Sequence, residues 1–293
     1  MFTPIGYFAP PAGAAGFDPT LGGTLTPYMW YDFTDSSTMT FSSGTNIEAI
    51  YSKGTNTGEL RKSPTSGFIA PVWNGSYTRF YGGSSTHGKL CRRYSTDGTD
   101  GSNDTLFQVG NSLTFIAFFN PLFTEAFEFS PFISMKSYNL TNGPDEYNML
   151  MMESNSPPSD STRTWTSTNT ATYPNIMTYY WNFGSRGIRY SFSGATPAGW
   201  NSWVSQQNGS SSINAGRTWN NKAGFGVGNY GTTNTAYENF TIGGRSRDNS
   251  PYGANVELAH VVLYSGLLTT QNIDDLITDY ETASGTLLNQ VNN

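Results

Sequence analysis

The chain has 293 residues, of which only 12% are charged, whereas aromatic residues make up 15% and glycine accounts for 32 positions. Disordered chains are rich in charge and poor in aromatics, and helical bundles are rich in Ala, Leu, Glu and Lys, so the composition excludes both classes and favours an all-β fold. A net charge of −6 leaves no basic surface to neutralise phosphates, and we expect no nucleic-acid partner.

The first predicted segment is an extended arm over residues 1–27. It carries five prolines and a single charge, Asp18, a composition that forms neither a helix nor a regular strand. Ordering such an arm costs on the order of 1 kcal/mol per residue, so contacts with a partner or with its own domain have to hold it. We predict a partner, and we expect a chain that begins near Leu25 to keep nearly full thermal stability. The candidate attachment residues are Pro4, Tyr7, Phe8, Pro10 and Phe17.

The N-terminal stretch lacks the features of a secretory signal. The first 30 residues contain no Lys or Arg and no continuous apolar core. The longest apolar runs, such as residues 115–119, are too short to cross a bilayer. We therefore expect synthesis in the cytoplasm and no membrane insertion. A single cysteine, Cys91, excludes an internal disulfide and is expected to lie half-buried on a strand.

Short strand-like runs bounded by turn signals follow from residue 28 onward. Residues 112–120 (SLTFIAFFN) alternate so that the odd-numbered positions from Leu113 share one face and the even-numbered positions from Thr114 share the other. Both faces are mostly apolar, which is typical of an inner strand in a stack of two sheets. Further runs of this kind are 147–153, 177–183, 189–192 and 257–264.

One amphipathic helix is predicted after Leu268. Thr269 or Thr270 can serve as its N-cap. The following apolar residues have helical spacing, so we expect the helix to cover the sandwich with one face. That face consists of Ile273, Leu276, Ile277 and Tyr280, and the same spacing turns Asp274, Asp275, Asp279 and Glu281 toward solvent.

The sequence offers little material for known catalytic sites. It contains only two histidines, His87 and His260, which leaves almost no material for a histidine-based triad or a zinc site. We interpret His260 as a packed strand residue. The nearest pair of carboxylates, Glu125 and Glu128, falls on opposite faces of a strand, which does not suit glycoside hydrolysis. We therefore expect a protein that is not an enzyme and needs no cofactor.

Two binding hypotheses remain. Asp97, Asp100 and Asp104 lie in a flexible loop that offers oxygen ligands for Ca²⁺, but the loop lacks the EF-hand order and a closing Glu, which favours a plain loop. Aromatic residues among Ser, Thr and Asn can stack on sugars, and the alternative is that they pack against loops or subunits. These aromatic candidates are Trp165, Tyr173 and Trp219.

Three stretches together resemble the laminin-G/concanavalin A-like sandwich family. They are the alternating run that ends in a proline at 112–121, the Trp-rich strand and Asn-Gly turn at 199–209, and the closing Ile-Gly-Gly, strand and helix pattern within 240–280. The resemblance implies a jelly-roll β-sandwich. Leu258-Ala259-His260 stands where the family commonly has an acidic residue, so no family ligand is transferred to this position.

Residues 22–38 resemble a second group, the structural and fibre proteins of tailed phages, in which a Gly/Pro arm leads into a "Trp-x-Asp" strand. This resemblance implies a virion location, with other virion proteins and further copies of the chain as partners. The predicted function is therefore a non-enzymatic virion protein attached through its arm. The alternative is a carbohydrate-binding adhesin that recognises host glycans. The predicted organisation is an arm at 1–27, a concanavalin A-like sandwich at 28–284 and a tail at 285–293.

Overall fold

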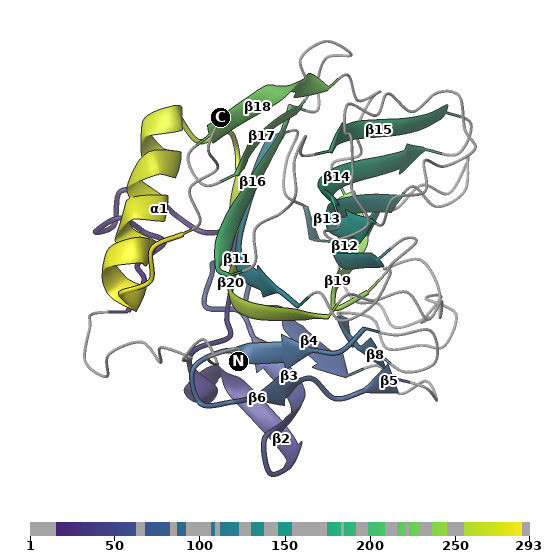
Figure 1. The fold of residues 1–293 in the computed structure, drawn as a ribbon, viewed down its shortest axis with the longest axis vertical. Helices are drawn as coiled ribbons and strands as arrows, with labels where there is room; N and C mark the ends of the chain where they lie inside the picture. The colour runs from purple at the N-terminus through teal and green to yellow at the C-terminus, as the bar shows by residue number, and fades with distance from the viewer. Residues whose placement is uncertain are drawn as a thin grey trace, which may run out of the picture.

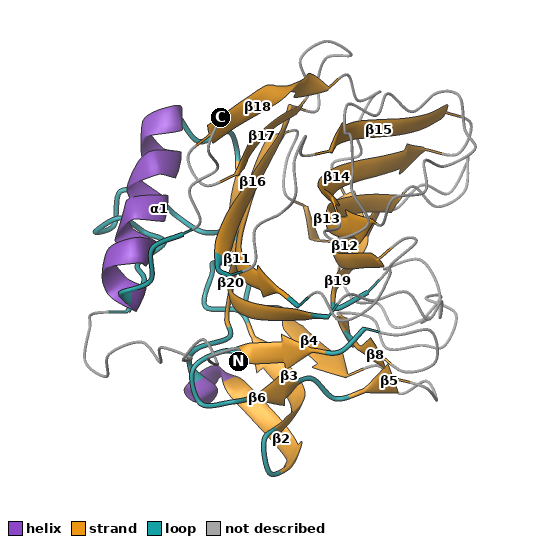
Figure 2. Cartoon of the chain, in the orientation of Figure 1, coloured by secondary structure: helices purple, strands orange, loops and turns teal. Residues whose placement is uncertain are grey.

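The computed structural model describes most of the predicted sandwich, namely residues 16–62, 68–82, 87–91, 107–108, 112–122, 130–137, 146–153, 175–182, 185–191, 199–208, 216–220, 223–228, 236–244 and 255–288. Within these residues the chain is almost entirely β-structure, as Figure 2 shows. The elements are β1 (Met29–Asp32), η1 (Ser36–Thr38), β2 (Met39–Ser43), β3 (Asn46–Tyr51), β4 (Glu59–Lys62), β5 (Phe68–Ile69), β6 (Val72–Trp73), β7 (Thr78–Phe80), β8 (His87–Gly88), β9 (Leu90–Cys91), β10 (Phe107–Gln108), β11 (Ser112–Pro121), β12 (Ser130–Ser137), β13 (Glu146–Glu153), β14 (Asn175–Asn182), β15 (Ser185–Ser191), β16 (Asn201–Asn208), β17 (Gly216–Asn220), β18 (Ala223–Gly228), β19 (Ala236–Ile242), β20 (Val256–Ser265) and α1 (Thr270–Ser284).

Antiparallel pairing builds two facing layers. One layer runs β18-β17-β16-β11-β20, and β20 continues to β1 at one end and to β7 at the other. The other layer runs β15-β14-β13-β12-β19. Figure 1 shows β12–β15 on one side of the molecule and β16–β18 on the other, with α1 outside the second group. The predicted all-β sandwich with one C-terminal helix is confirmed.

The central strand β11 is buried on both faces, as its alternation predicted. Its odd-numbered side chains, Leu113 to Phe119, lie in the core between the layers, where the rings of Tyr31 and Phe240 stack with centroids 5.8 Å apart. Ile116 and Phe118 point to the opposite, outer face and pack in a second cluster under α1. The sandwich therefore has a second apolar layer on the side that α1 covers.

A β-bulge shifts the neighbouring strand β20 by one residue. Phe118 pairs with His260 but Phe119 pairs with Leu258, so Ala259 has no partner of its own on β11. Leu258 consequently lies in the core between the layers, whereas His260 packs on the outer face. The prediction that His260 is a packed strand residue is confirmed. Without the bulge, strict alternation would put its side chain on the same face as Leu258.

The helix matches its prediction in both its cap and its buried face. Thr269 is the N-cap: its Oγ1 accepts a hydrogen bond from the Asn272 backbone N–H at 3.1 Å, and Asn272 Oδ1 accepts one from the Thr269 N–H. Gly285 ends the helix in the left-handed conformation. Leu288 then returns to the second cluster. The buried residues of the helix are Ile273, Leu276, Ile277 and Tyr280.

The end of the predicted arm packs on the sandwich itself. Phe17 is only 6% exposed, and its ring contacts Phe118, His260 and Tyr280 with centroids 4.8–6.0 Å apart. The Tyr264 hydroxyl donates to the Pro19 carbonyl at 2.8 Å. Of the predicted attachment residues only Phe17 is described, and it belongs to the domain; Pro4, Tyr7, Phe8 and Pro10 lie outside the described residues.

Loss of Phe17 is expected to destabilise the domain, which corrects the expectation that a chain beginning near Leu25 keeps its stability. Phe17→Ala should lower the free energy of unfolding by about 3 kcal/mol, because it removes a buried ring and leaves a cavity. Chemical denaturation measures this value. Leu287→Ala, at a side chain that is 83% exposed, is the matched control and should change it by less than about 0.5 kcal/mol. Equal stability of the two variants would contradict the burial of Phe17.

The cap of α1 gives a second test. Thr269→Ala should cost about 1 kcal/mol in unfolding free energy, because the N–H of Asn272 loses its acceptor at the helix start. Thr269→Ser keeps a hydroxyl at the same position and should stay within about 0.5 kcal/mol of the original chain. A thermal unfolding series that finds the two variants alike would show that the cap adds nothing.

Candidate functional site

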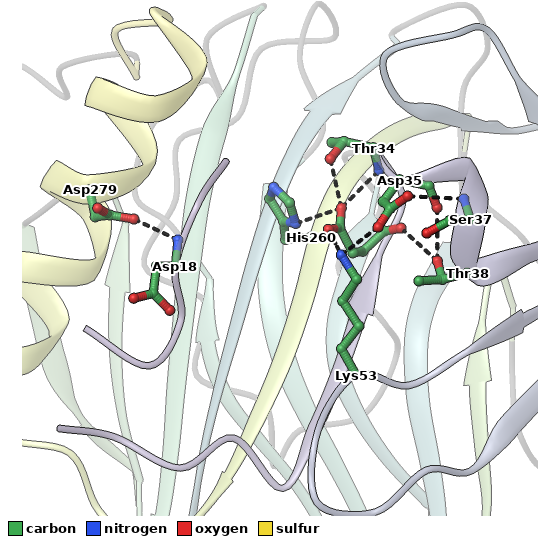
Figure 3. A network of polar contacts seen from close by, with 9 residues as sticks. Asp18, Thr34, Asp35, Ser37, Thr38, Lys53, His260 and Asp279 are labelled. Atoms are coloured by element: carbon green, nitrogen blue, oxygen red, sulfur yellow. Dashed lines mark hydrogen bonds and ion pairs between the residues drawn. The ribbon is translucent and has the colours of Figure 1, made fainter. Parts of the chain in front are cut away.

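Two polar clusters lie on the outer face of the sandwich, and the first is centred on Asp32 at the end of β1. Lys53 Nζ donates to Asp32 Oδ2 at 2.6 Å and lies 2.7 Å from Asp35 Oδ2. The backbone N–H and hydroxyl of Thr34 donate to Asp32 Oδ1 at 3.0 and 2.6 Å. Figure 3 shows Lys53 reaching up to this group from below and His260 approaching it from the left.

His260 completes the first cluster within an aromatic surround. Its Nδ1 lies 3.2 Å from Asp32 Oδ1, and its ring packs against Phe17 and Tyr280. Burial alone would raise the pKa of Asp32, but the charge of His260 and the hydrogen bonds from His260, Lys53 and Thr34 outweigh it and hold the pKa well below its usual range. The acceptor sites of the Asp32 carboxylate are thus taken by the chain itself. This cluster locks β1, the Lys53 loop and β20 together.

The second cluster surrounds Glu257 at the start of β20, and we call it the Glu257 site. It comprises five side chains from four parts of the chain: Tyr77, Arg79, Asn120, Trp200 and Glu257. Asn120 Nδ2 donates to Glu257 Oε2 at 2.7 Å, and the Tyr77 hydroxyl also bonds to the carboxylate. Arg79 pairs with Glu257 in the register of β7 and β20. Glu257 itself is only 6% exposed, whereas the other four side chains are half-buried and reach solvent.

Aromatic rings flank these polar groups. Tyr77 meets the Trp200 ring edge-to-face with centroids 5.4 Å apart, and the Arg79 guanidinium lies 4.8 Å from the centre of the Tyr81 ring. Trp200 follows Gly199, whose φ of 108° places it in a conformation open to glycine, and Asn201 Nδ2 donates to the Gly199 carbonyl at 2.7 Å. This turn fixes the orientation of Trp200, which directly precedes β16.

The electrostatics of Glu257 differ from those of Asp32. Burial raises the pKa of Glu257 above its ordinary value, although the hydrogen bond from Asn120, the charge of Arg79 and the hydrogen bond from Tyr77 act against the rise. A buried carboxyl group whose pKa is perturbed by burial and by a specific charged partner is a candidate for a functional site, and at Glu257 half-buried aromatic and amide groups surround it. We therefore take the Glu257 site as the candidate functional site.

The structure describes no side chain of the glycan and Ca²⁺ candidates predicted from sequence. Trp165, Tyr173, Asp97, Asp100 and Asp104 lie outside the described residues. Trp219 sits in β17 opposite Val204, and its side chain is not among those described. Within the described part of the chain, no three His, Cys, Asp or Glu side chains are grouped so as to hold a metal ion. The glycan and Ca²⁺ candidates therefore stay predictions.

Sequence reasoning missed all five residues of the Glu257 site, and one signal would have found part of it. Glu257 interrupts the apolar run of β20 directly after Val256, and a carboxylate in a strand that is buried on both faces needs partners. Asn120, near the end of β11, is paired with Glu257 in the register of β11 and β20. Nothing in the sequence indicates that Tyr77 and Trp200 join them.

Among the described residues, no helix is both long and apolar enough to span a membrane.

No protein-family model matches this chain, and no curated protein matches it. Among solved structures, a GH54 α-L-arabinofuranosidase soaked with a cyclic sulfate inhibitor has a TM-score of 0.50 and 11% identity, covering 92% of this chain and 65% of its own. Trypanosoma rangeli sialidase in complex with sialic acid has a TM-score of 0.48 and 14% identity, covering 88% and 32%. The binding domain of botulinum neurotoxin DC in complex with SialylT has a TM-score of 0.45 and 7% identity, covering 87% and 52%.

These similarities concern the fold alone, and the chain spans only a third to two thirds of the proteins compared. The arabinofuranosidase, an enzyme with a similar fold, nevertheless contradicts the expectation that the chain is not an enzyme. The spacing of carboxylates along the sequence does not decide this, because side chains on separate strands converge in the fold, as Asn120 of β11 and Glu257 of β20 do. The similar structures give no support to a phage origin.

The Asp32 cluster predicts how stability depends on pH. Because the folded-state pKa of Asp32 lies below its ordinary value of 3.8, its contribution is present above that value and is lost as the pH falls below it. Asp32→Asn should lower the unfolding free energy at pH 7 by about 3 kcal/mol and flatten the loss of stability in acid. Asp275→Asn, on the exposed side of α1, is the control. Denaturation series from pH 7 to pH 2 that are parallel for all three chains would contradict this role.

Proposed function

We propose that this chain is a carbohydrate-binding β-sandwich. The observation that carries the proposal is the Glu257 site: half-buried Tyr77 and Trp200 rings lie beside an amide, a guanidinium and a carboxylate whose positions are fixed by hydrogen bonds. Saccharides present apolar C–H faces and hydroxyl groups that both donate and accept. A partly apolar surface with a few oriented polar groups is the chemistry that recognises them.

The names of the similar structures agree with this proposal without adding evidence for it. The sialidases and the arabinofuranosidase are named for the sugars they act on, and the toxin domain is in complex with SialylT. Carbohydrate binding of this kind would serve adhesion to host glycans, which is the alternative function predicted from the sequence. The virion location remains a prediction of the sequence.

Carbohydrate binding should be weak for a single site, in the range of about millimolar, because one or two stacked rings and a few hydrogen bonds leave little free energy after the ordering costs. The full chain, displayed in many copies on a bead, should be retained by an array of immobilised glycans. Absence of retention on every glycan, at a density that retains a known millimolar binder, would contradict the proposal.

The array also decides between surfaces. If the Glu257 site binds the sugar, a chain with Trp165→Ala, Tyr173→Ala and Trp219→Ala together should keep its retention on the array. Loss of retention in this triple variant, with unchanged thermal unfolding, would instead assign the binding to the aromatic residues predicted from sequence. Carbohydrate binding as such would then stand.

A further inference from the structure

We infer that the Glu257 site takes a neutral saccharide, held through two neighbouring hydroxyl groups, and that Glu257 acts as the positioning residue beneath the groups that touch the sugar. The inference rests on the proposed function, since it names the ligand class and the surface for that binding. It assigns Asn120, Arg79, Tyr77 and Trp200 as the contact residues.

The charge of the site argues for a neutral ligand. Glu257 supplies one negative charge and Arg79 one positive charge, and the positive charge acts on the carboxylate. A sugar acid would add a second carboxylate near Glu257, with Arg79 as the single described cation of the site to compensate both. Recognition of carboxylates generally uses a guanidinium that is free to bind them in a bidentate manner. The charge of Arg79 instead acts on Glu257, and its guanidinium lies 4.8 Å from the centre of the Tyr81 ring.

The geometry of Asn120 argues for a pair of hydroxyl groups. A side-chain amide has two donor hydrogens and an acceptor oxygen. One of the donors is used for Glu257 Oε2, and this bond sets the plane of the amide. The amide keeps one donor hydrogen and its acceptor oxygen for a ligand, which suits two adjacent hydroxyl groups on a sugar ring, of which one accepts and the other donates.

Burial separates the role of Glu257 from that of its neighbours. Its carboxylate is nearly inaccessible, whereas Asn120 and Trp200 are half-exposed. A buried acceptor that holds an amide and a phenol in place lowers the ordering cost of binding without touching the ligand. Trp200, braced by the edge of Tyr77 at 5.4 Å and by Tyr280 of α1 at 6.5 Å between centroids, supplies the apolar surface for the sugar ring.

The first experiment titrates the full chain with methyl glycosides of neutral hexoses and with methyl glucuronide and methyl sialoside, followed by chemical shift changes. We expect the neutral glycosides to bind, and the acidic ones to bind at least about tenfold more weakly. Trp200→Ala and Asn120→Ala should each weaken the neutral ligands about tenfold or more. Tyr51→Ala, which removes an aromatic ring that is 39% exposed on β3, is the matched control and should leave affinity unchanged.

Each outcome has a separate meaning. Tighter binding of the acidic glycosides, or unchanged affinity in folded Trp200→Ala and Asn120→Ala, would overturn the inference while the proposed function stands. If none of the glycosides and none of the immobilised glycans binds, the proposed function fails together with it. Thermal unfolding of each variant shows that it is folded, and Asn120→Ser, which keeps a donor toward Glu257, provides a second variant if Asn120→Ala does not fold.

The second experiment tests the positioning role. The titratable and charged groups that face Glu257 among the described residues are Arg79 of β7 and Tyr77 of the preceding turn, so in mildly acidic solution Glu257 is the group whose charge changes. Affinity of the original chain should fall as the pH falls through the raised pKa of Glu257, because the protonated carboxyl holds Asn120 and Tyr77 less firmly. Glu257→Gln should bind more weakly at neutral pH and lose this pH dependence. A pH profile that Glu257→Gln leaves unchanged would overturn the positioning role.

Discussion

One extra residue in β20 determines which side chains of this strand lie on the outer face of the sandwich. The bulge at Ala259 reverses the alternation, so that Glu257 lies beside Asn120 and, further along, His260 lies beside Phe118 and Val262 beside Ile116. Without the bulge, either Glu257 and its neighbours or the aromatic layer under α1 would turn into the core between the sheets. Both polar clusters therefore depend on this local irregularity.

The outer face is divided into a covered part and an open part. Helix α1 and Phe17 cover the apolar centre of β11, β16 and β20, where Phe118 stacks on Tyr280 with centroids 4.0 Å apart. Two half-buried residues lie beyond that cover: Asn120, near the end of β11, and Trp200, which directly precedes β16. The same sheet face is thus packed under α1 where it is covered and presents half-buried polar and aromatic groups where it is not.

The two carboxylates at the centre of the polar clusters show why burial alone does not identify a ligand site. Asp32 and Glu257 are similarly buried, at 5% and 6% exposure. Asp32 is surrounded by charged and hydroxyl donors that lower its pKa and occupy its oxygens, which makes it a structural centre. Glu257 accepts hydrogen bonds from an amide and a phenol and has a raised pKa, and both of these partners are half-buried. The difference lies in the partners.

The sequence by itself determined the features that depend on neighbouring residues: the all-β class from composition, the two apolar faces of β11 from alternation, and the cap and buried face of α1 from helical spacing. These follow from short-range geometry, which the chain repeats at every step. Only the tertiary structure decided which distant side chains meet. Phe17 contacts Tyr280, Lys53 contacts Asp32, and Trp200 contacts Tyr77, because strand order and one bulge bring them together. Neither strand order nor a bulge is encoded in local periodicity.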